Sequence, residues 1–154
     1  MKKTFILLTA MLVSFGSIAQ QSIDLGTLWQ RYAFYAGGIS GLRSMNDSKH
    51  YTAQAEGTIE KYSYMTGEKV ATLLDVNFLA QEEDRVPNFD SYSLSNDEQW
   101  ALLKTETDQI YRRSSKSVVY VVNLQSLQAT KIRPEKISNA TFSPDGEYVA
   151  YVMD

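Results

Sequence analysis

Short runs of alternating apolar and polar residues recur along the chain, and the same kind of turn introduces such a run three times. In each copy a small polar segment reaches an aspartate, and three or four residues later an aromatic residue opens the alternating run. This alternation is typical of a β-strand that buries one face. The copies lie at residues 44–55, 93–104 and 141–152.

The spacing of these turns indicates an internal repeat. Their aspartates, Asp47, Asp97 and Asp145, lie 50 and then 48 residues apart. In the last turn, Pro144 presets one backbone dihedral and Gly146 accepts a positive φ, as tight turns require. We therefore expect equivalent turns, each followed by an equivalent strand.

The residues between the turns continue the pattern in step. After the shared segment, each of the first two copies holds a strand, a tight turn and a further strand. These lie at residues 58–64, 66–68 and 70–74 in the first copy, and at 118–124, 125–127 and 129–132 in the second. Repeats of about fifty residues with four short strands are typical of β-propeller blades. The recurring period favours an all-β, partial β-propeller of about two and a half blades of four antiparallel strands. The alternative is a β-sandwich with irregular hairpins.

The second copy contains an insertion. From the aspartate to the turn between the later strands is 20 residues in the first copy and 30 in the second. The additional residues fall around the sequence ETDQIYRRSS, at residues 106–115, which includes Arg112 and Arg113. Insertions in repeat proteins map to loops, often on the binding face. The arginine pair is therefore expected in a loop outside the shared scaffold.

Residues 1–19 have the layout of a secretory signal peptide. Two lysines precede an apolar run of eleven residues, and small residues then suit cleavage before Gln20. The run is too short to span a bilayer, and no second apolar stretch suggests a membrane span. We expect an exported chain in which residues 20–40 are a lead-in segment and residues 41–154 are an incomplete N-terminal propeller domain.

Composition excludes several function classes. The 15 lysines and arginines, less the two lysines of the signal peptide, leave 13 basic against 18 acidic residues, so nucleic acid is not an expected partner. The chain has no cysteine, so packing alone must hold it together in an oxidising compartment. With a single histidine, His50, and no thiolate, we expect neither a metal site nor another cofactor.

No catalytic group is expected within the chain. The serine nucleophile elbow, Gly-x-Ser-x-Gly, is absent. His50 follows a turn directly and is interpreted as structural or exposed, because a catalytic base must face a nucleophile. The acidic run at residues 82–84 is interpreted as a solvated connector between blades.

Three segments together resemble the N-terminal region of bacterial dipeptidyl peptidase IV, a member of the prolyl oligopeptidase family of serine peptidases. They read SGLRSMNDSKHYT at residues 40–52, IYRRSS at residues 110–115 and NATFSPDGEYVAYV at residues 139–152. IDLGTLW, at residues 23–29, is similar to the segment that precedes the first blade in those enzymes. The resemblance covers essentially all of the chain after the signal peptide.

The resemblance implies a serine exopeptidase that removes dipeptides from peptide N-termini, preferring proline or alanine in the second position. Such enzymes join a propeller to a C-terminal α/β-hydrolase domain and bind the peptide substrate in the cavity between them. The chain would then be an N-terminal fragment, inactive alone, of an enzyme in the periplasm or on the surface of a bacterium. The full-length enzyme could also form a homodimer. The alternative from another class is an exported, non-enzymatic propeller that binds a peptide or protein partner.

The resemblance also assigns a role to Arg112. This residue matches a family arginine that reaches into the cavity and hydrogen-bonds a carbonyl group near the substrate's N-terminus, whereas Arg113 falls where the family varies. A guanidinium suits that task because it is always charged and offers a rigid fork of donors. The residues alone suggest a solvated arginine paired with Glu106 or Asp108, and such a surface bridge contributes little stability. With the resemblance, Arg112 is the predicted substrate contact.

Overall fold

The computed structural model describes residues 24–30, 34, 38–79 and 85–153. The chain divides into two compact units, Met1–Gly38 and Ile39–Asp154, each of which is considered by itself. The predicted signal peptide and the acidic run at residues 82–84 lie outside the described residues.

The first unit contains a short π-helix, η1 (Gly26–Gln30). Oδ1 of Asp24 accepts a hydrogen bond from the backbone N–H of Thr27 at 2.6 Å, which satisfies a donor at the start of the helix. This hydrogen bond holds the pKa of Asp24 below its ordinary value. The helix lies within the predicted lead-in segment, whose boundary at residue 40 stays a prediction.

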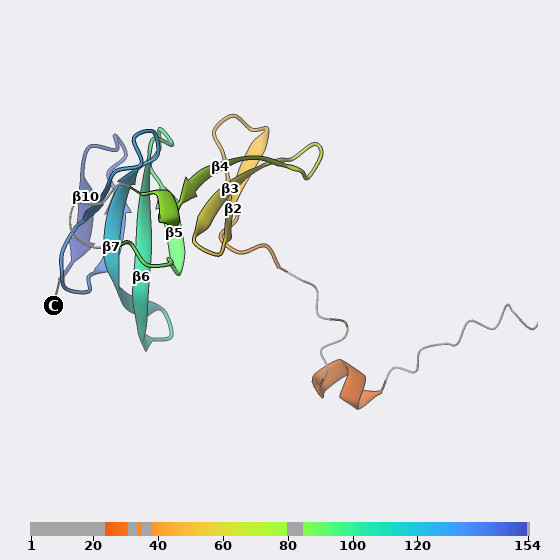
Figure 1. Ribbon diagram of the computed structural model, residues 1–154. Coiled ribbons are helices and arrows are strands. Elements are labelled where there is room, and N and C mark those ends of the chain that lie inside the picture. The colour runs from red at the N-terminus through yellow and green to blue at the C-terminus, as the bar shows by residue number, and fades with distance from the viewer. Residues whose placement is uncertain (1–23, 31–33, 35–37, 80–84, 154) are drawn as a thin grey trace, which may run out of the picture. The chain divides into compact units, whose positions relative to one another are not determined.

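The described part of the second unit forms three antiparallel sheets, in each of which the strands follow one another in chain order (Figure 1). The first sheet contains β1 (Arg43–Ser44), β2 (His50–Ala55), β3 (Thr58–Ser63) and β4 (Lys69–Asp75). After the short 3₁₀-helix η2 (Val76–Phe78), the second contains β5 (Ser91–Leu94), β6 (Trp100–Tyr111), β7 (Ser114–Asn123) and β8 (Ala129–Lys131). The third contains β9 (Ser138–Phe142) and β10 (Val149–Val152). These successive meanders, which do not close, confirm the predicted partial propeller.

The repeat turns share one hydrogen-bonding pattern. In each, Oδ1 of the aspartate accepts a hydrogen bond from the backbone N–H two residues later, at 2.9 Å for Asp47 and at 3.1 Å for both Asp97 and Asp145. In the second and third turns, a serine hydroxyl donates to the aspartate and accepts from the N–H of the aromatic residue that follows, at 3.0 Å for both Ser95 and Ser143. The predicted internal repeat is therefore confirmed at the level of individual contacts.

The residue after each of these aspartates has a positive φ. The value is 55° at Ser48, 58° at Glu98 and 77° at Gly146. Glycine adopts this conformation at no steric cost, whereas a residue with a Cβ is strained there. The prediction for Gly146 is confirmed, and the same backbone geometry is imposed on two non-glycine residues.

The second sheet is buried on both faces, because each face packs against a neighbouring sheet. Along β6 and β7, Leu103 and Tyr120 enter a core shared with the first sheet, whereas Leu102 and Val119 enter a core shared with the third. A strand buried on both faces reads as a continuous apolar run rather than an alternating one. The apolar run at residues 118–122 is explained in this way, and the strand predicted at residues 118–124 is confirmed as part of β7.

Candidate functional site

The insertion in the second repeat extends a hairpin instead of forming a loop. Strands β6 and β7 continue past the core, and Tyr111 pairs with Ser114, so that Arg112 and Arg113 form the two-residue connection between them. We call residues 106–117 the arm; it is the free end of the β6–β7 hairpin in Figure 1. The arginine pair lies in the loop of this hairpin, as expected, but the rest of the insertion is strand, because the residues on both sides keep pairing their backbones after the core has ended.

Along β6, burial ends where the arm begins. Thr105 is fully buried, whereas every residue from Glu106 to the end of β6 is exposed. Near the tip, Ile110 is 41% exposed and Tyr111 is 76% exposed. The side chains of the tip are therefore accessible to a ligand.

The guanidinium groups of Arg112 and Arg113 are exposed and have no hydrogen bond or ion pair with any residue that the structure describes. The surface pairing considered for Arg112 is not formed, since Oδ2 of Asp108 binds Nζ of Lys136 at 2.8 Å instead. No ion pair joins Arg112 to Glu106 either, in the part of the chain described. Arg112 thus keeps all its N–H donors for a ligand, and the identity of that ligand stays a prediction.

A β-bulge lies at the base of the arm. The ladder shifts between Thr105 and Asp108, where two residues of β6, Glu106 and Thr107, oppose the single residue Ser117 of β7. Glu106 has a φ of 51°, the left-handed conformation that the first residue of such a bulge often adopts. Bulges bend a strand and change where the residues beyond them point, so this one contributes to the direction of the arm, together with a second shift of the ladder between Gln109 and Tyr111.

Thr107 ties the bulge to its surroundings. Its backbone N–H donates to Oδ2 of Asp90 at 2.9 Å, and its hydroxyl oxygen lies 2.8 Å from Oγ of Ser117. Ser117, which is buried, exchanges two backbone hydrogen bonds with Ile137, at 3.0 and 2.9 Å. The base of the arm is therefore attached to the segment before β5 and to the segment before β9.

The residues that hold the arm were not identified from the sequence. Asp90, Thr107 and Ser117 are small polar residues of kinds that are common on any surface. The contacts of Thr107 join positions 17 and 10 residues apart, and no local pattern reports such pairs. The available signal was the polar run at residues 105–108, which follows the alternating run at residues 93–104 and begins the insertion.

His50 belongs to the first repeat turn. Its Nδ1 lies 2.6 Å from Oδ2 of Asp47, and Nζ of Lys61 lies 3.4 Å from the same oxygen. The hydrogen bond from His50 and the backbone donors of the turn hold the pKa of Asp47 well below its usual range. This histidine has a structural contact, as expected, and the described residues include no group of three potential ligands that could hold a metal ion.

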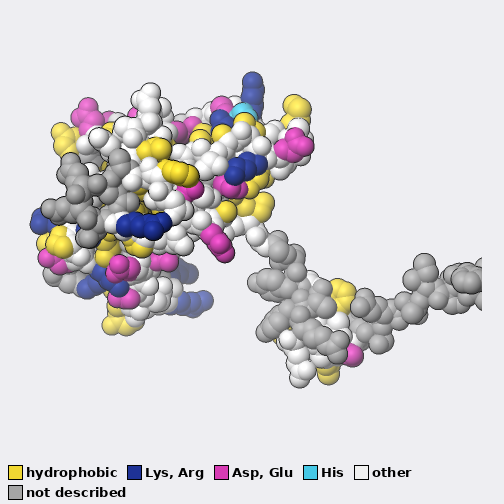
Figure 2. All heavy atoms as spheres, viewed as in Figure 1, with side chains coloured by type: hydrophobic (Ala, Val, Ile, Leu, Met, Phe, Trp, Pro, Cys, Tyr) yellow, Lys and Arg dark blue, Asp and Glu magenta, His cyan; other side chains and the backbone are white. Residues whose placement is uncertain are grey.

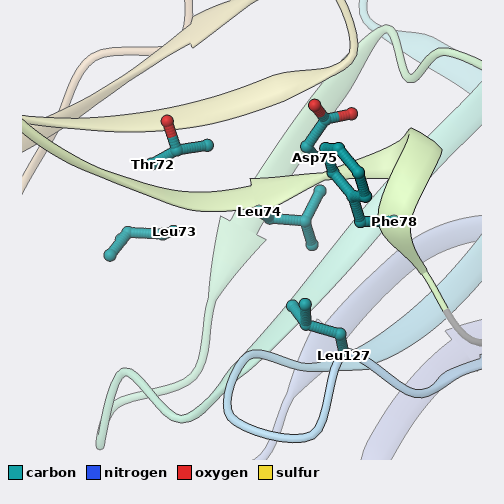
Figure 3. A pocket seen from close by; sticks show the side chains of 6 residues that line it. All are labelled: Thr72, Leu73, Leu74, Asp75, Phe78 and Leu127. Atoms are coloured by element: carbon teal, nitrogen blue, oxygen red, sulfur yellow. The ribbon is translucent and has the colours of Figure 1, made fainter.

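Two open pockets lined wholly by described residues lie between neighbouring sheets, and no residue of the arm lines either. The first, of about 280 Å³, is mostly apolar, with Leu74 and Leu127 on facing sides (Figure 3). Its one carboxylate, on Asp75, is already bound to the backbone N–H of Asn77 at 2.8 Å. The second, of about 370 Å³, lies between β5 and β9. Neither pocket gathers the convergent polar groups of a typical ligand site.

Acidic and basic side chains are interspersed on the side of the surface seen in Figure 2, so no large patch of one charge forms there. Among the helices that the structure describes, none is long and apolar enough to cross a membrane. The arm, with its unpaired arginines, is therefore the candidate functional site.

The sequence and the structure were compared with known proteins, and one protein family matches. Residues 95–154 match the family described as Dipeptidyl peptidase IV (DPP IV) N-terminal region. The crystal structure of Porphyromonas gingivalis dipeptidyl peptidase 4 is similar to this chain at 32% identity with a TM-score of 0.71, over 88% of this chain and 20% of that chain. This chain thus spans only one fifth of that protein's length.

A weaker likeness, to Kuenenia stuttgartiensis hydrazine synthase, has 16% identity and a TM-score of 0.44 over 73% of this chain and 31% of that chain, and it supports no inference. No curated protein matches the chain.

Proposed function

Because this chain belongs to the dipeptidyl peptidase IV N-terminal region family, we propose that it forms the first part of the propeller of an exported, dipeptidyl peptidase IV-like serine exopeptidase. The complete enzyme would release dipeptides with proline or alanine in the second position from peptide N-termini. This chain would contribute to substrate access and binding. The catalytic triad would come from an α/β-hydrolase domain outside it.

The observation that carries the proposal is the guanidinium of Arg112, which has no partner among the described residues, at the tip of an arm whose base is fixed. A cation free of protein carboxylates can direct its donors at a substrate carbonyl group without first breaking an ion pair. Contacts to parts of the substrate remote from the reacting bond help catalysis by orienting it. Arg112 is accordingly proposed as the substrate contact, and Arg113 as a solvated neighbour.

The remaining parts of the proposal concern location and organisation. Residues 1–19 would direct export to the periplasm or cell surface and would be removed, which leaves residues 20–40 as the lead-in segment and residues 41–154 as propeller. The similarity to a bacterial dipeptidyl peptidase is compatible with export. A homodimer of the complete enzyme is compatible with this proposal but is not needed by it.

The second candidate is an exported propeller without enzyme activity that binds a peptide or protein partner. The exposure of Ile110 and Tyr111 beside the arginine pair favours it, because apolar and aromatic side chains are common at the centre of protein interfaces. The two candidates differ in whether the complete protein cleaves a peptide.

The test uses the protein encoded by the complete reading frame that contains this chain. Release of a chromogenic amine from a glycyl-prolyl substrate is measured for the wild type, Arg112→Ala and Arg113→Ala. The neighbouring arginine is a matched control, since it has the same charge, exposure and freedom from partners. We expect a loss of roughly 10- to 100-fold in kcat/KM for Arg112→Ala only, the magnitude of one hydrogen bond from a charged group.

Full activity of Arg112→Ala would contradict the substrate contact while keeping the enzyme. No cleavage by the wild type would contradict the peptidase and favour the binding propeller.

A further inference from the structure

The arm is held at its base from two sides, whereas its tip is free. On one side Asp90, which precedes β5, binds Thr107; on the other Lys136, which precedes β9, binds Asp108. Beyond Asp108, no described residue of the arm up to Ser115 forms a hydrogen bond or ion pair outside the arm. Arg112 follows Asp108 by four residues, or about 13 Å of extended strand, so a small rotation at the base displaces the guanidinium by several ångströms.

These contacts lie where the strand bends. Thr107 is within the bulge, and Asp108 is the first residue of β6 that resumes pairing after it. Bulged residues lose ladder hydrogen bonds. Contacts with groups outside the ladder therefore help to determine how far the strand bends at the bulge. The carboxylate of Asp90 satisfies the backbone N–H of Thr107 that the bulge leaves out of the ladder.

The ion pair between Lys136 and Asp108 contributes little to holding the sheets together. The side chain of Asp108 is 69% exposed in its ion pair with Lys136, and ion pairs of such exposure contribute little to stability. The second sheet is already held by buried residues on both faces. These contacts are therefore better suited to orienting the arm than to stabilising the sheets.

We propose that Asp90 and Lys136 are positioning residues that fix the direction of the arm and thereby place Arg112 against the substrate. This inference rests on the proposed function of Arg112. Catalytic contacts must be held to within about an ångström to be effective, and the contacts of Asp90 and Lys136 add to the backbone hydrogen bonds between Ser117 and Ile137 in holding the base of the arm.

The first experiment is a double-mutant cycle in the complete encoded protein, with the glycyl-prolyl substrate. We expect Asp90→Ala to lower kcat/KM by roughly 3- to 10-fold in the wild-type background and to have no effect when Arg112 is already alanine. A merely structural loss would lower activity by the same factor in both backgrounds and would overturn the proposal. Lys136→Met provides the same comparison for the other side of the arm.

Two further variants serve as controls. Asp90→Asn keeps an oxygen that can accept from the N–H of Thr107, so it should restore most of the activity. Asp75→Ala removes a carboxylate that accepts from a backbone N–H at 2.8 Å in the first sheet, away from the arm, and should leave kcat/KM unchanged. Failure of Asp90→Asn to exceed Asp90→Ala would overturn the role assigned to that hydrogen bond.

The second experiment reports the direction of the arm without activity. This chain contributes no cysteine of its own, so nitroxide labels at Ser115→Cys and Ser126→Cys give a distance between the arm and the opposite end of the second sheet. We expect Asp90→Ala to broaden the distance distribution. An unchanged distribution would overturn the proposal whatever Arg112 does. A broadened distribution together with full activity of Arg112→Ala would instead leave the orienting contact standing and remove the proposed substrate contact.

Discussion

The hydroxyl oxygen of Tyr92, in the second sheet, lies 2.6 Å from Oγ1 of Thr52, in the first sheet, and donates to the carbonyl oxygen of Gly41 at 2.7 Å. Tyr92 and Thr52 are both buried, at 3% and 0% exposure. This polar contact crosses the core between the two sheets and so fixes how they pack. Burial raises the pKa of Tyr92, which keeps its hydroxyl protonated and able to donate.

Tyr92→Phe should therefore destabilise the chain by about 1–3 kcal/mol, because it leaves the buried hydroxyl of Thr52 and the half-buried carbonyl of Gly41 without their partner. Chemical denaturation followed by fluorescence would measure the change in unfolding free energy. Tyr148→Phe is the control, since Tyr148 is 70% exposed and should tolerate the substitution. Equal effects of the two substitutions would show that the contact does not form in solution.

Ser48→Gly should stabilise the chain by up to about 1 kcal/mol. Ser48 has a φ of 55°, which strains a residue with a Cβ, and the gain is reduced because glycine makes the unfolded chain more flexible. Gly146→Ala, at the equivalent position with a φ of 77°, should have the opposite sign. Denaturation midpoints of both variants test the equivalence of the turns, which opposite signs would support and like signs would contradict.

The repeat was predictable because its turns carry local information. An aspartate that binds the N–H two residues later, as Asp97 does, and a glycine at positive φ, such as Gly146, act within a few residues of chain. The apolar run at residues 118–122 likewise reports burial on both faces of one strand.

The candidate site was only partly predictable. The arginine pair was visible as part of an insertion, but the strand conformation of the residues on either side of it was not, because the pairing of β6 with β7 continues through polar residues. The contacts of Asp90 and Lys136 depend on which segments the fold brings together, and neither has a sequence signature. Local pattern thus located the insertion, whereas the direction of the arm follows from tertiary contacts.

Asp47 should make the stability of the chain sensitive to acid. Its hydrogen bond with His50, together with the backbone donors of the turn, lowers the pKa of its carboxyl group in the folded state below the ordinary 3.8. A lowered folded-state pKa contributes stability that is present above the unfolded value and is lost as the pH falls through the folded one. Unfolding free energies measured from about pH 6 to about pH 2 should fall less steeply for Asp47→Asn than for the wild type. Parallel curves would contradict the contribution of this carboxylate.

Arg112→Lys should not restore the activity lost in Arg112→Ala. Lysine keeps the positive charge but replaces the planar fork of donors by a compact, strongly hydrated ammonium group. We expect Arg112→Lys in the complete protein to stay at least roughly 5-fold below the wild type in kcat/KM, while Arg113→Lys is unchanged. Full activity of Arg112→Lys would show that charge alone is needed, as for general electrostatic attraction of a substrate.

Leu102→Ala and Leu103→Ala together test whether the second sheet lies between two others. Both leucines are fully buried, but they are neighbours on β6 and therefore enter different cores, Leu102 with the third sheet and Leu103 with the first. Each substitution should cost about 2–5 kcal/mol in unfolding free energy, as large-to-small changes in packed cores do. Val70→Ala is the control, because Val70 is 55% exposed on β4 and its substitution should change stability by under about 0.5 kcal/mol.

A strand in a two-layer sandwich buries only one of its faces, so in that fold one of the two leucines would behave like the control. Comparable losses for both leucines would exclude the sandwich alternative, since only a blade packed between neighbours buries consecutive residues of the same strand.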